Sequence, residues 1–82
     1  MQKTFHLTIA SPHTSFFDGE AISVTLPGQE GDFTVLGAHT PFVTVLREGS
    51  AFVRTNAGEE KTFEMVQGAV VEVSRNVTTV LL

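Results

Sequence analysis

The chain has 82 residues, no cysteine and a formal net charge of −4. This length predicts one compact domain with a small core, and the lack of cysteine excludes a disulfide framework, a thiolate metal site and a thiol nucleophile. The acidic charge has the wrong sign for neutralising phosphates, so no nucleic-acid partner is expected.

The start of the chain shows no targeting signal. Residues 1–6 alternate polar and apolar side chains and lack the continuous apolar stretch of a signal peptide. No segment of the chain approaches the roughly 18 uninterrupted apolar residues that a membrane-spanning helix requires. We therefore expect neither export nor direct insertion into a membrane.

The predicted elements are strands. Apolar and polar residues alternate at 5–9 and again at 22–26, which is typical of half-buried strands. Similar apolar runs predict strands at 33–36, 42–46, 50–55, 61–66, 70–74 and 78–82. Half of the residues in 69–82 are β-branched, which favours two strands there over a helix. Asn56 and Gly58 tolerate positive φ and predict a hairpin turn between two of these strands.

These spacings predict an all-β fold: a single flattened β-barrel or β-sandwich of about eight to ten short strands. No repeat, linker or low-complexity tract interrupts the pattern, so one domain is expected to cover residues 1–82.

A search for catalytic residues finds no convincing set. His6, His13 and His39 lack the short spacings that bring metal ligands together. Ser11, His13 and Asp18 invite a triad interpretation, but no Gly-x-Ser-x-Gly elbow presents the serine. The chain is therefore not expected to be an enzyme.

The glycine-bearing segment 27–32 is not a phosphate-binding loop, because it has no lysine and carries Glu30 and Asp32. Two carboxylates also fall short of the six to eight oxygen ligands that Ca²⁺ prefers. No cofactor or metal is expected. Phe16 and Phe17 point to opposite faces of any strand, so either protein covers both rings or one ring meets a partner.

One long motif resembles a known family. Residues 24–41 read Val-Thr-Leu-Pro-Gly-Gln-Glu-Gly-Asp-Phe-Thr-Val-Leu-Gly-Ala-His-Thr-Pro. This stretch resembles the epsilon subunit of F-type ATP synthases, and the resemblance continues at 5–7, 17–19, 46–49, 68–73 and 76–81. A departure is Ala69, where relatives commonly carry a second glycine after Gly68.

The resemblance implies a non-catalytic rotor subunit in the central stalk of a hydrogen-ion-transporting ATP synthase, in its CF(1) sector. Such a subunit grips the gamma subunit and rests on the polar loops of the membrane c-ring, coupling ion-driven rotation to ATP synthesis. The implied location is the cytoplasmic face of the bacterial plasma membrane, the cell inner membrane, as a peripheral component. Typical members add a two-helix C-terminal domain that inhibits hydrolysis and can bind ATP; because the sequence stops at Leu82, neither activity is expected.

The resemblance also implies a ring-facing site. It places the Gly31–Asp32 turn and the turn at 37–39 at the end that faces the ring, with Glu30 and Asp32 meeting basic groups. His39 belongs to the same predicted site, and Phe42 is expected to supply apolar contact. The sequence specifies neither the face that meets gamma nor the coupling ion, H⁺ or Na⁺.

Two other classes of function compete with this one. A biotinyl or lipoyl carrier domain has a similar length, but it needs a modified lysine at a hairpin tip beside methionine, and Met65 lies between Glu64 and Val66. A sandwich that binds a sugar or another small ligand predicts an aromatic-lined site, and the chain has no Trp or Tyr. No small-molecule substrate is therefore expected.

Overall fold

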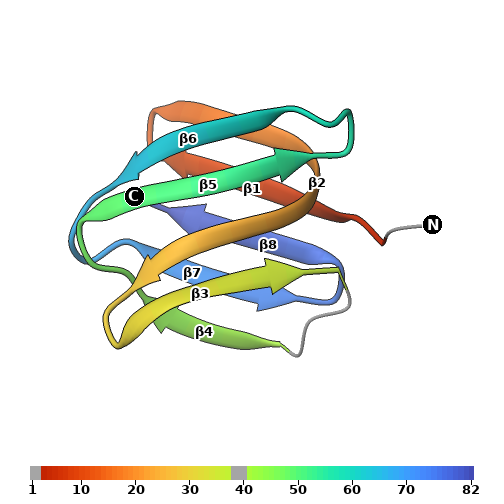
Figure 1. Ribbon diagram of the computed structural model, residues 1–82. Coiled ribbons are helices and arrows are strands. Elements are labelled where there is room, and N and C mark those ends of the chain that lie inside the picture. Colours follow the sequence, from red (N-terminus) through yellow and green to blue (C-terminus); the bar gives the residue numbers. More distant parts are fainter. Residues whose placement is uncertain (1–2, 38–40) are drawn as a thin grey trace.

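The computed structural model describes residues 3–37 and 41–82, and every regular element in this part is a β-strand. The strands are β1 (Phe5–Ser11), β2 (Thr14–Gly28), β3 (Gly31–Leu36), β4 (Phe42–Val45), β5 (Gly49–Thr55), β6 (Glu60–Met65), β7 (Val70–Ser74) and β8 (Val77–Leu81) (Figure 1).

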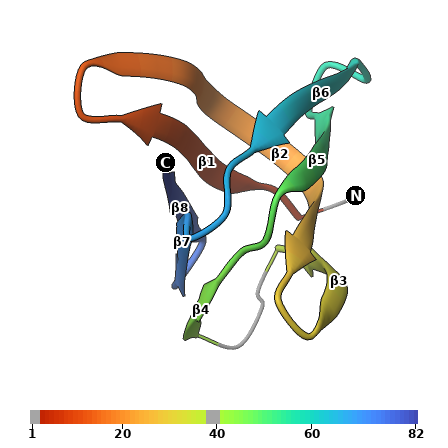
Figure 2. The ribbon, with the colours of Figure 1, turned by 90° about the vertical axis from the view of Figure 1, so that its left-hand side faces the viewer.

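The strands form two layers that share β2. The first sheet has the order β4-β7-β8-β1-β2, in which β1 and β8 are parallel and the other neighbours are antiparallel. Beyond Ala21 the same β2 pairs with β5 and with β3, and β6 follows β5 to complete the second sheet. Figure 2 shows β7 and β8 on one side and β3 and β5 on the other. An irregularity in register between Ala21 and Ser23 lies where β2 passes from one layer to the other.

The core lies between these layers and follows the alternation of the sequence. On β1, Phe5, Leu7 and Ile9 are buried while the residues between them are half-buried. The other strands contribute alternate residues in the same way, giving a core of Ala21, Val24, Leu26, Val35, Leu46, Ala51, Val53, Met65, Ala69, Val71, Val73 and Val80.

Two pairs of phenylalanine rings close the sandwich. Each pair joins two strands that are not paired with each other within residues 3–37 and 41–82. Phe17 of β2 meets Phe63 of β6 edge to face, with centroids 5.9 Å apart. Phe33 of β3 meets Phe42 of β4 in the same manner at 5.6 Å. Edge-to-face pairs are favourable because the positive ring edge faces the negative ring face. The two sheets are thus joined through β2 on the backbone and through aromatic rings at both open seams.

The predicted fold class is confirmed, as are the hairpin at Asn56–Gly58 and the two strands within 69–82. The strand predicted at 22–26 is part of the longer β2, which has 15 residues and begins at Thr14. Asp18 and Gly19 are uncommon in strands, but here Asp18 lies on the exposed outer face and Gly19 is half-buried opposite Leu7.

Candidate docking surfaces

The turn between β2 and β3 depends on two glycines. Gly28 pairs with Gly31 across a two-residue turn formed by Gln29 and Glu30. Gly31 has a φ of 131°, a conformation that side chains other than glycine rarely adopt. A Cβ atom on Gly28 would lie 2.6 Å from the carbonyl oxygen of Gly31, so this position excludes any larger residue.

The connection between β4 and β5, residues 46–48, holds this turn in place. The Arg47 guanidinium contacts the Asp32 carboxylate, with Nη2 2.6 Å from Oδ1. The Arg47 N–H donates to the carbonyl of Pro27 at 2.9 Å, and the Gln29 N–H donates to the carbonyl of Val45 at 3.2 Å. Between these contacts, Leu46 is completely buried. Turn and connection therefore form one unit.

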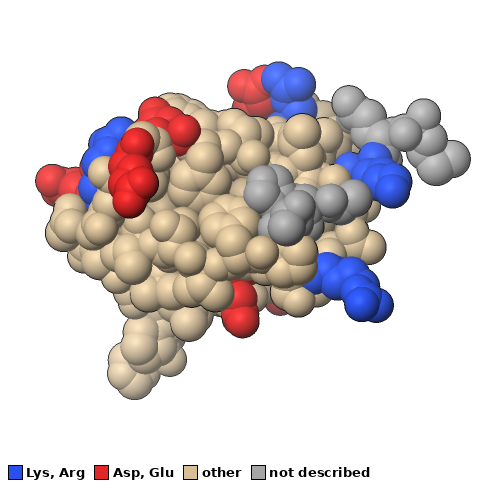
Figure 3. Space-filling model, turned by 90° about the horizontal axis from the view of Figure 1, so that it is seen from below, with Lys and Arg blue, Asp and Glu red and all other residues tan. Residues whose placement is uncertain are grey.

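We call this unit the turn end and define its charged side chains as Glu30, Asp32, Arg47 and Glu48. All four are exposed, and three carboxylates outnumber one guanidinium. Seen from below, acidic side chains gather at the end of the molecule where β2 meets β3, and uncharged residues cover most of the middle (Figure 3). The turn end is thus negative and suits a partner with basic groups.

A hollow of about 430 Å³ adjoins the turn end and extends between residues 28–33 and residues 42–44. Phe42 lines it but is only half-exposed, because its ring packs on Phe33. Val43, the next residue, points outward and is 65% exposed. Val43 therefore presents more exposed apolar surface than Phe42 does.

The structure brings most of the predicted site together. Glu30, Gly31 and Asp32 lie in one turn, and Phe42 lines the hollow beside it. His39 lies outside the described residues. The expectation that the turn at 31–32 and the turn beginning at Gly37 share one end is wrong, because they lie at opposite ends of β3. Six extended residues separate them by about 20 Å.

A second surface lies on the outer face of the first sheet. The register places Val45 beside Val70, Val70 beside Leu81, and Leu81 beside Ala10, across β4, β7, β8 and β1. Val45 and Val70 are each 37% exposed and Leu81 is 55% exposed. We call Val45, Val70, Leu81 and Ala10 the apolar row. A continuous apolar stripe on an outer sheet face is typical of an interaction surface.

The opposite part of this outer face carries a charged cluster. His6 of β1 lies between two carboxylates of β2, with Nε2 in close contact with Asp18 and Nδ1 3.2 Å from Glu20. Thr4 also donates its hydroxyl to Glu20 at 3.0 Å. The hydrogen bond to Asp18, followed by that to Glu20, raises the pKa of His6 above its ordinary value. With an acceptor at each ring nitrogen, this geometry favours the doubly protonated imidazolium.

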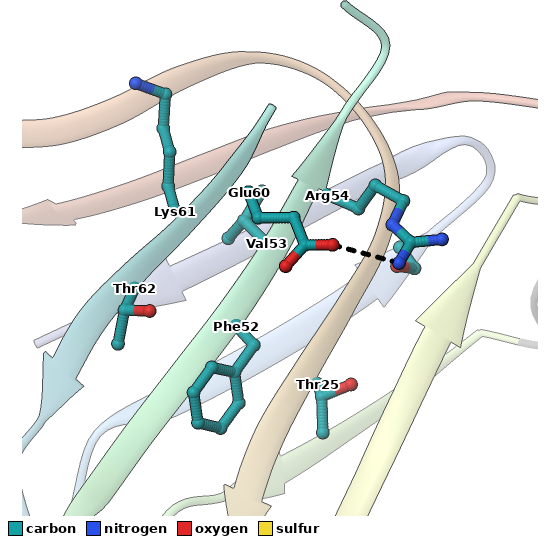
Figure 4. Close-up of a pocket in the computed structure, with 8 residues that line it drawn as sticks. Thr25, Phe52, Val53, Arg54, Glu60, Lys61 and Thr62 are labelled. Carbon is teal, nitrogen blue, oxygen red and sulfur yellow. Dashed lines mark hydrogen bonds and ion pairs between the residues drawn. The ribbon is translucent and has the colours of Figure 1, made fainter. Parts of the chain in front are cut away.

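The outer face of the second sheet has a shallow hollow of about 160 Å³ around Phe52 (Figure 4). Thr25 and Thr62 flank the ring, and Arg54 is paired with Glu60 at 3.1 Å. Ligand pockets usually enclose about 300 to 1,000 Å³ and direct several polar groups inward. This hollow therefore gives little support to the small-ligand alternative.

Within residues 3–37 and 41–82, no group of three His, Asp or Glu side chains is arranged so that it could hold a metal ion. The same part of the chain contains no helix that is long and apolar enough to cross a bilayer.

Comparison with known proteins identifies the family. The model of the ATP synthase delta/epsilon chain β-sandwich domain matches residues 4–82. The chain belongs to this family. The family predicted from the motif at 24–41 is thus confirmed, and the match extends over both docking surfaces described above.

Relatives in the epsilon family agree along nearly the whole chain. The ATP synthase epsilon chain of Bradyrhizobium sp. (strain ORS 278) is 44% identical over 78 residues, covering 95% of this chain and 56% of the relative. That of Janthinobacterium sp. (strain Marseille) is 36% identical over 81 residues, covering 99% and 58%. The chain therefore spans little more than half the length of the curated epsilon chains it matches.

Solved structures share the epsilon-type fold. A chain in the cryo-EM structure of the Euglena gracilis mitochondrial ATP synthase, OSCP/F1/c-ring, superposes with a TM-score of 0.88 at 19% identity, covering 99% of this chain and 51% of that one. A chain in the central stalk/c-ring structure from Tetrahymena thermophila gives 0.77 at 19% identity, covering 99% and 65%. At this identity, the likeness establishes the fold alone.

The sequence did not predict that Arg47 or the apolar row belongs to a candidate docking surface. Arg47 follows Asp32 by 15 residues, and only the fold shows that the two meet. The exposed valines did leave a signal, because Phe42 and Thr44 alternate with Val43 and Val45 on β4. All four side chains can be buried in a core, so the alternation by itself did not show which two face outward.

Proposed function

We propose that this chain is the β-sandwich part of a central-stalk subunit of an F-type ATP synthase and that it couples the c-ring to the gamma subunit without catalysing a reaction itself. The observation that carries the proposal is the family match over residues 4–82 together with relatives named ATP synthase epsilon chain. The role proposed is mechanical: transmission of rotation driven by H⁺ or Na⁺ to the shaft that drives ATP synthesis.

In this proposal the turn end meets the polar loops of the ring. Glu30, Asp32 and Glu48 give it excess negative charge, which suits basic groups on those loops. Exposed ion pairs contribute only about 0.2 to 1 kcal/mol each, so these charges would set orientation and encounter rate more than affinity.

The apolar row is the proposed surface for gamma. A partner that must stay attached through continuous rotation needs a stable interface, and the buried centre of such interfaces is apolar. Val45, Val70 and Leu81 present that chemistry on adjacent strands, with Val43 exposed next to them on β4.

The two proposed surfaces adjoin each other. Val45 ends β4 within the apolar row, and its carbonyl accepts the N–H of Gln29 from the turn end. A load applied to the turn end would therefore reach the apolar row through a hydrogen-bonded backbone and a buried Leu46. Short paths through packed core and strands suit the transmission of torque because protein interiors have low compressibility.

The proposed location follows from the complex: peripheral, on the cytoplasmic face of the bacterial plasma membrane, held there by the ring and gamma. The relatives are bacterial epsilon chains, which supports this placement.

The experiment is reconstitution from purified parts. We would mix the chain with gamma and with detergent-solubilised c-ring from the same complex, then follow co-elution by size-exclusion chromatography. We expect a ternary assembly and a weaker binary complex with each partner, because the two adjoining surfaces consist of different residues. Elution of the chain alone in every mixture would contradict the proposed function.

A further inference from the structure

Arg47 contacts only one of the two carboxylate oxygens of Asp32. Nη2 of Arg47 donates to Oδ1 at 2.6 Å, and Oδ2 has no hydrogen bond or ion pair with the residues that the structure describes. The Asp32 side chain is 62% exposed and that of Arg47 is 45% exposed. One carboxylate oxygen is therefore held within the chain while the other is available to a partner.

Arg47 is itself firmly placed. Its N–H donates to the carbonyl of Pro27 at 2.9 Å, and the preceding Leu46 is completely buried. Nη1 of Arg47 donates to the carbonyl of Glu48 at 3.3 Å, and a Cβ on Gly49 would lie 3.4 Å from this same nitrogen. The guanidinium is thus held both by the carbonyl of Glu48, next to it in the chain, and by Asp32 of the β2–β3 turn.

We infer that Arg47 is a positioning residue for ring docking, which orients Asp32 through Oδ1 so that Oδ2 faces a basic group on the ring. The inference rests on the proposed function, since it assigns a role within the turn end that this function uses. It differs from a simple stabilising role because the proposed effect of the Arg47 side chain on the ring is exerted through Asp32.

Arg47 has two opposing effects on a basic partner. Its positive charge repels that partner, and because both cations would contact the same carboxylate, they would lie within the roughly 8 Å over which salt at 0.15 M screens exposed charges only partly. Its contact also removes the ordering cost of an otherwise free Asp32, which corresponds to about two- to tenfold in affinity. At physiological salt we expect the positioning effect to be the larger.

The test is a double-mutant cycle on the dissociation constant of the chain for detergent-solubilised c-ring at 0.15 M salt. The variants are Arg47→Gln, Asp32→Asn and the two combined. We expect Arg47→Gln to weaken binding about two- to tenfold in the wild-type background. In the Asp32→Asn background the same change should have no further effect, because a positioning residue has nothing left to orient.

A charge swap distinguishes a positioning role of Arg47 from a role that is limited to stabilising the β2–β3 turn. Asp32→Arg combined with Arg47→Asp keeps an ion pair between the two positions, so thermal unfolding should match the wild type while ring binding is lost. If the doubly swapped variant bound the ring as the wild type does, Arg47 would only stabilise the turn, and the inference would be wrong.

The chain supplies a matched control. Arg54 pairs with Glu60 at 3.1 Å and is similarly exposed, but it lies on the outer face of the second sheet. We expect Arg54→Gln to leave ring binding unchanged, and an equal loss in both arginine variants would overturn the inference.

The remaining outcomes are also decisive. Equal or tighter binding by Arg47→Gln would make Arg47 a competitor of the ring, and a loss that persists beside Asp32→Asn would show a direct contact; either result overturns the inference while the proposed function stands. Failure of the wild-type chain to bind the ring at all would overturn both.

Discussion

Leu81 offers the sharpest test of the apolar row. It is 55% exposed on β8, between Val70 of β7 and Ala10 of β1. Complete burial of a leucine side chain contributes about 1.5 to 3 kcal/mol, so covering the exposed half would contribute about 0.8 to 1.6 kcal/mol. We expect Leu81→Ala to weaken binding to gamma by that amount, or about four- to fifteenfold in the dissociation constant.

Leu36 provides the control, because it is the same residue type and is 54% exposed, but it lies on β3 in the second sheet. Leu36→Ala loses a comparable apolar area on folding, so both variants should show similar falls in thermal unfolding temperature. Isothermal titration calorimetry with purified gamma then measures docking separately from stability. We expect Leu36→Ala to bind as the wild type does.

Two results would refute this reasoning. Equal weakening by both variants would mean that the loss arises from stability rather than from docking. Unchanged binding by Leu81→Ala, with the complex still formed, would place gamma on another face of the sandwich.

Two further predictions concern the fold. Since contacts with Asp18 and Glu20 raise the pKa of His6 above 6.5, their stabilising effect is complete below the unfolded pKa and is lost as pH rises through the folded pKa. Urea midpoints should therefore fall as pH rises above about 6.5 in the wild type, and a His6→Gln variant with the same slope would refute this. Gly28→Ala should destabilise by about 1 to 3 kcal/mol, since its Cβ would lie 2.6 Å from a backbone oxygen. Gly19→Ala, whose Cβ would meet only the Phe17 ring at 3.5 Å, should leave the thermal unfolding temperature nearly unchanged; an equal loss in both variants would contradict the steric argument.

Strand identity was predictable because burial follows the alternation of the sequence. Phe5, Leu7 and Ile9 are inside, as their spacing predicts. The extent of β2 was not predictable from alternation alone, since Asp18 and Gly19 are uncommon in strands. Their conformation is decided by pairing with β1, which is a tertiary effect that local propensity does not contain.

The candidate site was predictable where it depends on the turn itself. Glu30, Gly31 and Asp32 are consecutive, so a turn predicted from sequence brings them together. Arg47 joins them only because the bridge between Gly28 and Leu46 brings the β4–β5 connection beside the turn. A contact between residues so far apart in the chain leaves no local signal.

The parallel pairing of β1 with β8 constrains how the protein is made. The first strand to leave the ribosome finds one of its two neighbours only after residues 77–81 have emerged. Until then β4 and β7 are not part of a ladder of paired strands with β1, because β8 lies between β7 and β1 in the first sheet. Strand pairs between residues so far apart in the chain form slowly. Until β8 pairs with it, the edge of β1 has unpaired backbone groups that could pair with strands of other polypeptides. The strand that completes the apolar row is therefore also the strand that closes the first sheet, so the surface proposed for gamma forms only after residues 77–81 have paired with β1.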